Sequence, residues 1–330
     1  MKRWFKKQTW RGVLIAERHL RRTAAWQDLL TMQGRQAAWE VGKLERLGQL
    51  SDAEFKVFSQ GGEDGILEWL VSHLPAIPQS FVEFGVEDYL ESNTRFLLCQ
   101  RNWRGLVMDA SPAHIESLRS HEAYWKHDLK VVAAFIDTES VNPLISGHGF
   151  RGELGVLSID VDGNDYWIWN AIDVVNPWIV VVEYNAVLGD LHPFTIPYDA
   201  AFSRARAHYS WLYFGASIRA LECLGKTRGY TLLGSNLGGW NAFFLRNDVG
   251  RRIQEAIADK SPRPSLFRDS RGRDGRMSYA GGIDRLALIA EMPVLDLTSG
   301  RLLRLEDAGE VYSDRWKAIM GESGCVTARN

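Results

Sequence analysis

The chain has 330 residues, which exceeds the roughly 100–200 residues of an ordinary domain and predicts one large unit with extensions. Hydrophobic residues make up 45% and charged residues 24%, as in soluble globular proteins, which excludes disorder or a coiled coil for most of the chain. The formal net charge of −2 argues against a nucleic-acid-binding protein.

The net charge is divided unevenly along the chain. Residues 1–22 hold eight Lys/Arg and one Glu, a net of +7, whereas residues 23–250 hold 17 basic and 28 acidic residues, a net of −11. Residues 251–330 hold 14 basic and 12 acidic residues, a net of +2. The basic start predicts either a solvated helix or homo-oligomer contact, or a peripheral contact with an anionic membrane or another protein. The acidic middle disfavours a nucleic-acid partner.

The cysteines and apolar runs indicate the compartment. Cys99, Cys223 and Cys325 lie far apart without a CxxC pair, which argues against a disulfide framework or thiolate zinc site and favours a reducing, cytoplasmic location. The apolar runs at 155–161 and 178–182 are strand-sized, well short of the roughly 18–20 residues of a membrane helix. The run at 13–16 is too short for a signal-peptide core.

Helical and strand patterns then follow in chain order. Apolar residues at helical spacing predict a helix over 23–48. Short apolar runs separated by helical stretches predict five strands, namely 81–86, 105–109, 131–136, 155–160 and 178–183. Ser111-Pro112 is typical of a helix start. Strands alternating with helices predict an α/β, doubly wound, mostly parallel sheet.

The end of this pattern predicts an antiparallel closing hairpin. A helix over 216–228 is followed by strands at 230–233 and 240–246, which flank the turn-rich segment 234–239. The sheet then has seven strands in a Rossmann-like arrangement. We expect a basic helical N-terminal extension over 1–54, the sheet domain over 55–250 and an accessory C-terminal extension over 251–330.

The predicted parallel strands end in, contain near their end, or are directly followed by carboxylates: Glu83, Asp109, Asp137, Asp160 and Glu183. Ligands of open α/β sheets bind beyond the carboxyl ends of the strands, so these acids are expected near one ligand site. Each acid alone is consistent with a solvated strand end or a helix cap. Together they need hydroxyl donors, a metal ion or a cationic ligand, because like charges repel.

The first strand-to-helix turn argues against a dinucleotide. Residues 83–88 hold a single glycine, Gly85, and the acids Glu87 and Asp88 follow it. A dinucleotide fingerprint needs glycines where the backbone approaches the pyrophosphate, and acids there repel it. A positively charged ligand with a ribose fits better, and Asp109 is placed to accept the ribose hydroxyls.

Four motifs carry a resemblance to a known family. They are Phe-Val-Glu-Phe-Gly at 81–85, Met-Asp-Ala-Ser at 108–111, Ser-Ile-Asp-Val-Asp-Gly-Asn-Asp at 158–165 and Val-Val-Glu-Tyr-Asn at 181–185. In this order they resemble the class I S-adenosylmethionine-dependent methyltransferases, most closely the FkbM type. The resemblance covers roughly residues 55–250 and implies O-methylation of a hydroxyl on a saccharide or small metabolite.

The resemblance also implies roles for individual residues toward S-adenosylmethionine. Glu83 and Gly85 would shape the turn around its methionine part. Asp109, with Ala110, would hold the ribose, and Asp137 and Thr138 would lie near the adenine. An upstream segment would close the cofactor from the N-terminal side through Ser59, Gln60 and Asp64.

The segment 160–165 concentrates oxygen ligands after a buried strand. With Glu183, the acids Asp160 and Asp162 form a candidate Mg²⁺ site, and both aspartates are candidate catalytic residues. The alternative is a capped helix start without metal. His192, in the loop after the fifth strand, is a candidate base or an incidental loop residue.

Two other functions stay open at this point. The segment Asp160-Val161-Asp162 also resembles the metal-binding Asp-x-Asp motif of nucleotide-sugar glycosyltransferases. The glycine-poor turn is consistent with a catalytically inactive scaffold or glycan-binding module.

Overall fold

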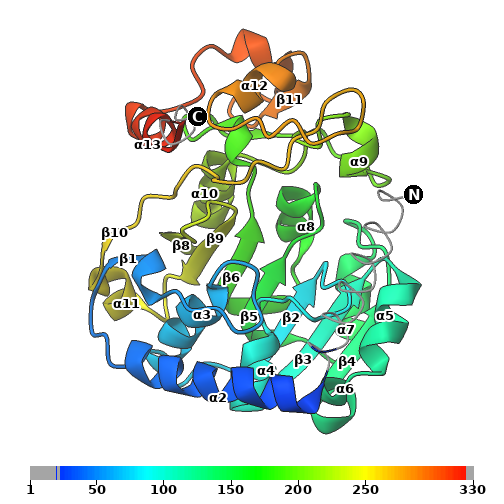
Figure 1. Cartoon of the computed structure of the whole chain (residues 1–330), viewed down its shortest axis with the longest axis vertical. Coiled ribbons are helices and arrows are strands. Elements are labelled where there is room, and N and C mark those ends of the chain that lie inside the picture. Colours follow the sequence, from blue (N-terminus) through cyan, green and yellow to red (C-terminus); the bar gives the residue numbers. More distant parts are fainter. Residues whose placement is uncertain (1–19, 21–22, 325–330) are drawn as a thin grey trace, which may run out of the picture.

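A seven-stranded sheet forms the centre of the computed structural model, which describes residue 20 and residues 23–324 (Figure 1). Its strand order is β4-β3-β2-β5-β6-β9-β8, in which β9 alone runs antiparallel to its neighbours. The strands are β2 (Ser80–Phe84), β3 (Arg104–Asp109), β4 (Leu129–Ala133), β5 (Gly152–Ile159), β6 (Val175–Glu183), β8 (Tyr230–Ser235) and β9 (Asn241–Arg246). The predicted Rossmann-like α/β sheet with its antiparallel closing hairpin is therefore confirmed.

Alternation along the strands divides the apolar side chains between two cores. In β2, Val82 and Phe84 belong to one core, whereas Phe81 belongs to the other. The first core lies against helices α7 (Val141–Gly147), α8 (Asp165–Ala171) and α10 (Ile218–Thr227). The second lies against α3 (Glu63–Ser72), α4 (Arg95–Arg101), α5 (Pro112–Arg119) and α11 (Arg251–Ala256). The sheet is covered on both faces, as its continuous apolar strands require.

Two helices begin at serine caps. Ser111 accepts a hydrogen bond from the amide of His114, and Pro112 occupies the first turn of α5. Ser217 accepts from the amide of Ala220 at the start of α10. The helix start predicted at Ser111-Pro112 is therefore confirmed.

The N-terminal part departs from the predicted helix over 23–48. Helix α2 spans Ala24–Val41 and ends at Gly42. The chain then forms β1 (Leu47–Gln49), parallel to β10 (Ile257–Asp259), and the 3-10 helix η1 (Leu50–Ala53). Pairing with a strand 210 residues later in the chain overrides the local helical pattern. Most of the basic segment 1–22, predicted to contact a membrane or partner, lies outside the described residues.

The C-terminal part builds a small second sheet at the end of the molecule opposite α2 (Figure 1). It has the order β12-β11-β7, with β11 (Pro293–Asp296) between β12 (Arg301–Arg304) and β7 (Phe194–Thr195). Strand β7 lies in the segment that the sequence predicts as a loop after β6. The remaining elements are α6 (Glu122–Lys126), η2 (Ala186–Leu188), α9 (Arg204–Ala207), α12 (Asp284–Leu288), η3 (Leu305–Ala308) and α13 (Asp314–Gly324).

Within residue 20 and residues 23–324, no helix combines the length and the hydropathy that crossing a bilayer requires. Cys99 and Cys223 are free thiols.

A buried tryptophan provides a test of the core. Trp169 on α8 is 1% exposed and packs on Phe244, with ring centroids 4.8 Å apart. We expect Trp169→Ala to lower the free energy of unfolding by about 3–5 kcal/mol, because it leaves a large cavity. Trp125→Ala is the matched control, since Trp125 is 73% exposed, and should change it by less than about 0.5 kcal/mol. Chemical unfolding measures both, and equal losses would contradict the assignment of Trp169 to the core.

Candidate functional site

A cleft of about 640 Å³ opens at the carboxyl ends of β2, β3, β5 and β6. Four of the five predicted strand-end acids line it: Glu83, Asp109, Asp160 and Glu183. Of the other predicted site residues, Gln60, Gly85, Ala110 and Asp162 line it as well. The topology therefore brings residues from four separate strands to one site, as expected for an open α/β sheet.

The turn after β2 needs its single glycine. Gly85 has φ +73°, and a Cβ atom there would lie 1.7 Å from the backbone oxygen of Asp160. Any side chain at this position would collide with the chain leaving β5. Gly85 thus sets how closely the ends of β2 and β5 approach each other at the cleft.

Glu83 organises the loop that follows this turn. Its buried carboxylate accepts hydrogen bonds from Ser92 Oγ at 2.5 Å, from the Asn93 amide at 2.8 Å and from the Thr94 amide at 3.1 Å. The Thr94 hydroxyl donates to it as well. Burial raises the pKa of Glu83, and the hydrogen bonds oppose that rise. Most of its acceptor capacity is therefore used within the protein.

Asp109 joins two segments of the cleft wall. One of its oxygens accepts from the Glu87 amide at 2.8 Å, and the other accepts from the Ser111 amide at 2.8 Å. His114 Nδ1 lies 3.3 Å from the second oxygen. The carboxylate thus holds the turn after β2 against the start of α5. Asp109 also lines the cleft. Its Oδ2, with one of these contacts, keeps capacity to accept from a ligand.

The structure places Asp137 and Thr138 outside the set of described residues that line the cleft. Asp137 Oδ1 accepts from the amides of Glu139 and Ser140, which caps the chain entering α7. Thr138 hydrogen-bonds through its hydroxyl to Tyr198. The residues just before them face the cleft instead, namely Ala134, Phe135 and Ile136. An adenine near β4 would contact this apolar segment.

Of the upstream segment, Gln60 lines the cleft, whereas Ser59 and Asp64 are buried behind it. Asp64 Oδ2 accepts from the amides of residues 57, 58 and 59 at 2.7–2.8 Å and from the Ser59 hydroxyl at 2.9 Å. Burial raises the pKa of Asp64 to about 6. This pair therefore shapes the loop that carries Gln60.

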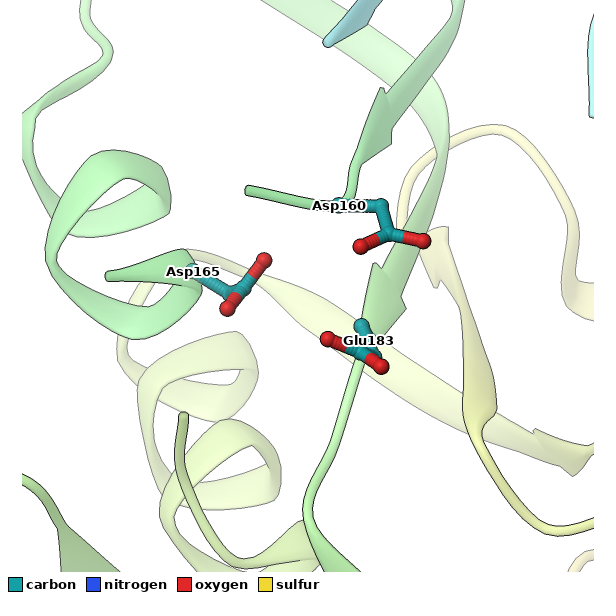
Figure 2. Close-up of side chains that lie close together, drawn as sticks. All are labelled: Asp160, Asp165 and Glu183. Carbon is teal, nitrogen blue, oxygen red and sulfur yellow. The ribbon is translucent and has the colours of Figure 1, made fainter. Parts of the chain in front are cut away.

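Three carboxylates converge at the other end of the cleft (Figure 2). Asp160 follows β5, Asp165 begins α8 and Glu183 ends β6, and one oxygen of each lies within 4.8 Å of the others. The sequence placed Asp162 in this cluster and missed Asp165. Asp162 has φ +55° and a side chain that is 69% exposed, so it turns away at the tip of the loop.

Burial and mutual repulsion raise the pKa of these acids. For Asp160, burial contributes most and the charges of Asp162 and Asp165 add to it, so its pKa lies well above the ordinary value. Glu183 is raised well above its ordinary pKa by burial and then by Asp160. Burial raises the pKa of Asp165 to about 6, although its oxygens accept from the amides of Val161 and Gly163.

Arg204 is a cation at this end of the cleft, and its charge opposes the rise in pKa of Asp160 and Glu183. It donates to Asp162 at 3.2 Å, to Asp269 at 2.9 Å and to the backbone oxygen of Trp211 at 2.6 Å. Its guanidinium also lies over the ring of Phe214, 3.9 Å from the centroid. Burial opposes its charge, yet the surrounding acids raise its pKa. It ties the loop after β5 to the C-terminal extension.

His192 lies apart from the described residues that line the cleft. Its Nε2 is 2.9 Å from the backbone oxygen of Glu310, and its ring stacks on Phe194 with centroids 5.1 Å apart. It thus contacts the C-terminal extension, and its predicted catalytic role finds no support in this position.

The C-terminal extension, which the sequence predicts to be an accessory segment, supplies a wall of the cleft. Ser265, Phe267 and Asp269 line the cleft, and Phe267 stacks on Trp240 with centroids 4.2 Å apart. Arg285, 2% exposed, donates to the backbone oxygens of Ser265 and Phe267 and so holds this wall. No local motif marks these residues, since the contact depends on the tertiary fold.

A second layer of polar side chains supports the segment 236–241, which borders the same wall. Glu63, which is fully buried, accepts from the side-chain amides of Asn236 and Asn241 at 2.8 and 3.0 Å. Glu54 accepts from the amide of Leu237 at 2.5 Å. Burial, and then the charge of Glu63, raise the pKa of Glu54 to about 7. This layer positions the segment that carries Trp240 into the cleft.

Comparisons with known proteins return distant structural likenesses. No family model matches the chain, and no curated protein matches it, so the FkbM-type resemblance stays a prediction. The solved structures similar to it include a protein from Pyrococcus horikoshii that is assigned as an RNA methyltransferase. The two share 10% sequence identity and a TM-score of 0.34, and the likeness covers 66% of this chain and 98% of that chain. The N-terminal domain of EvdMO1 with S-adenosylhomocysteine bound has 10% identity, 64% and 94% coverage and a TM-score of 0.37. An O-methyltransferase from Bacillus cereus in complex with S-adenosylhomocysteine has 16% identity, 64% and 89% coverage and a TM-score of 0.36.

The raised pKa of Glu54 predicts a pH-dependent stability difference. An acid with a raised pKa in the folded state stabilises folding while protonated, and that contribution is lost as it ionises. The unfolding free energy of the wild type relative to Glu54→Gln should therefore fall by roughly 1–3 kcal/mol as the pH rises from about 4.5 to about 7. Urea unfolding across this range measures it, and a pH-independent difference would contradict the buried charge.

Proposed function

We propose that the protein is an S-adenosylmethionine-dependent methyltransferase that methylates a hydroxyl group on a saccharide or small metabolite. The single observation that carries this proposal is the division of the cleft. One end is built by the turn at Gly85 and by Asp109 at the end of β3, and the other gathers carboxylates after β5 and β6. A nucleoside fits the first end, and a nucleophile that must lose a proton fits the second.

The cofactor end favours a nucleoside without phosphate groups. Asp109 retains acceptor capacity for ribose hydroxyls, and Phe135 offers an apolar surface beside it. Glu87 and Glu91 also line this region, and their charge attracts a sulfonium or ammonium group while repelling phosphate. S-adenosylmethionine combines a ribose, an adenine and a sulfonium cation, so its chemistry matches these residues.

At the acceptor end the carboxylates can receive a proton. In the transfer, the acceptor oxygen forms a bond to the methyl carbon while the bond from that carbon to sulfur breaks, which leaves a neutral thioether. The hydroxyl proton passes to a carboxylate of the cluster. Asp160, which lines the cleft and has a raised pKa, is suited to accept it. The enzyme otherwise acts by holding the oxygen in line with the sulfur–carbon bond.

The charges in the cleft favour substrates without phosphate groups over nucleotide sugars. Two arginines line the cleft, and each uses three of its five N–H donors within the protein. Arg204 binds Asp162, Asp269 and a backbone oxygen, and Arg285 binds three backbone oxygens. A glycosyltransferase would need positive charge for the diphosphate, and among the described lining residues these two arginines are committed elsewhere.

Ligand binding tests the cofactor assignment. S-adenosylhomocysteine at about 100 times its Kd should stabilise the protein by about 2.7 kcal/mol and raise Tm by several degrees, whereas UDP should not. Asp109→Ala should abolish the shift, and Asp173→Ala, an exposed aspartate outside the cleft, should retain it. Differential scanning fluorimetry measures all three proteins. Stabilisation by UDP alone would favour the glycosyltransferase.

Turnover tests the proton acceptor. Asp160→Asn should lower the rate of methyl transfer by roughly 100-fold or more, because it removes the carboxylate while preserving the shape of the side chain. Its shift with S-adenosylhomocysteine should match that of the wild type, which separates loss of chemistry from loss of binding. Mass spectrometry of a panel of sugars and alcohols detects the added methyl group. An unchanged rate in the variant would remove Asp160 from the proposal.

A further inference from the structure

Helix α2 carries an apolar stripe on its outer side. Leu29, Met32 and Trp39 are large apolar residues, yet they are 44%, 63% and 67% exposed. At about 100° per residue they fall within about 80° of one another around the helix axis, with Ala25 and Gln36 between them. These five residues form the outer stripe. Single apolar residues on a surface are ordinary, whereas a line of them along one helix is typical of a surface that binds a partner.

The inner side of the same helix packs on the protein. Gly34 and Ala38 are buried there, and a Cβ atom on Gly34 would lie 2.6 Å from the ring of Phe96 in α4. Helix α2 contacts α3 as well and lies across the outside of both helices (Figure 1). This packing explains the inner side and leaves the outer stripe unexplained. A helix that is apolar on both sides is typically covered on both, so the outer stripe calls for a second cover.

The charge of the preceding segment indicates what kind of surface provides that cover. Between residues 23 and 43, two acidic residues balance two basic ones, so α2 itself has no excess of positive charge. The net charge of +7 lies in residues 1–22. Arg21 and Arg22 directly precede Thr23, so chain continuity alone brings two of these charges to the start of α2. An apolar helix side next to a cluster of Lys and Arg is typical of proteins that lie on anionic lipid.

Trp39 and Lys43, at the other end of α2, fit the same environment. Lys43 Nζ lies over the ring of Trp39. At the boundary between water and a bilayer, an indole ring lies at the level of the headgroups. A lysine there lays its apolar stem along the apolar surface while its ammonium group contacts water or lipid phosphate. The pair therefore suits a lipid surface better than a protein interface, from which lysine is depleted.

We propose that the outer stripe of α2 docks the protein on the surface of an anionic bilayer. Leu29, Met32 and Trp39 enter the headgroup region, and the basic residues of 1–22 supply the attraction to anionic lipid. The outer stripe lies outside the set of described residues that line the cleft, so docking leaves the cleft open to its ligands. The contact does not depend on methyl transfer, and it can be tested without a cofactor or an acceptor.

Vesicle sedimentation with the full chain tests the docking. One set of vesicles contains equal parts of phosphatidylcholine and phosphatidylglycerol, and the other contains phosphatidylcholine alone. Binding to the anionic set should be at least about tenfold stronger, because several basic residues act near the surface. Raising NaCl from about 0.05 M to about 0.5 M should weaken it, since salt shortens the range of the attraction. No binding to the anionic vesicles at low salt, or equal binding to both sets, overturns the proposal.

Variants of exposed residues locate the contact. Met32→Gln and Trp39→Ala should each weaken binding to anionic vesicles at least about tenfold, because each removes apolar surface from the docked helix. Leu302→Gln is the matched control, since Leu302 is 61% exposed and lies on β12, at the end of the molecule opposite α2 (Figure 1). It should bind as the wild type does. All three variants should keep the Tm of the wild type, because the replaced side chains are exposed.

Three outcomes contradict the assignment to the outer stripe. The first is unchanged binding in both Met32→Gln and Trp39→Ala, and the second is an equal loss of binding in Leu302→Gln. The third is a concentration-dependent dimer that forms without vesicles and that Met32→Gln and Trp39→Ala abolish, as measured by analytical ultracentrifugation. That result would assign the stripe to a contact between two copies of the chain and overturn docking on lipid.

Discussion

Repulsion among carboxylates at one edge of the sheet is the constraint on which the cleft depends. The parallel topology forces the acids that end successive strands into one region, where burial makes each charge costly. Glu83 is stabilised by hydroxyl and amide donors, and Asp162 by Arg204. Asp160 and Glu183 receive least from the protein, so the remaining interactions must come from a proton or a ligand.

The two extensions contact each other, and the C-terminal one also contacts the cleft. Strand β1 of the N-terminal part pairs with β10, and Arg315 of α13 binds Asp259 of β10 at 2.5 Å. The C-terminal extension supplies Asp269, which binds Arg204, and Arg285, which holds the segment that bears Phe267. The cleft is therefore closed by residues far beyond the sheet domain, and a truncated domain would lack one wall.

The sequence was a good guide where the signal is local. Alternation and apolar runs predicted all seven strands of the sheet, and Ser111-Pro112 predicted the start of α5. Four strand-end acids were correctly expected near one site, because each lies within one residue of the end of its strand. Asp137 lies four residues beyond β4, and it accepts a hydrogen bond from the chain that enters α7 instead. The distance of an acid from the end of its strand therefore decided whether it reached the cleft.

By itself, the sequence determined the Rossmann-like sheet, its antiparallel closing strand and the edge at which the acids gather, since periodicity and strand ends are written locally in the chain. Only the tertiary structure decided which acids meet. Asp165 joins Asp160 and Glu183 because α8 turns it inward, while the left-handed backbone at Asp162 directs that side chain toward Arg204 and solvent. Likewise, no local pattern brings Phe267 onto Trp240, because contacts between residues distant in the chain arise only when the elements pack.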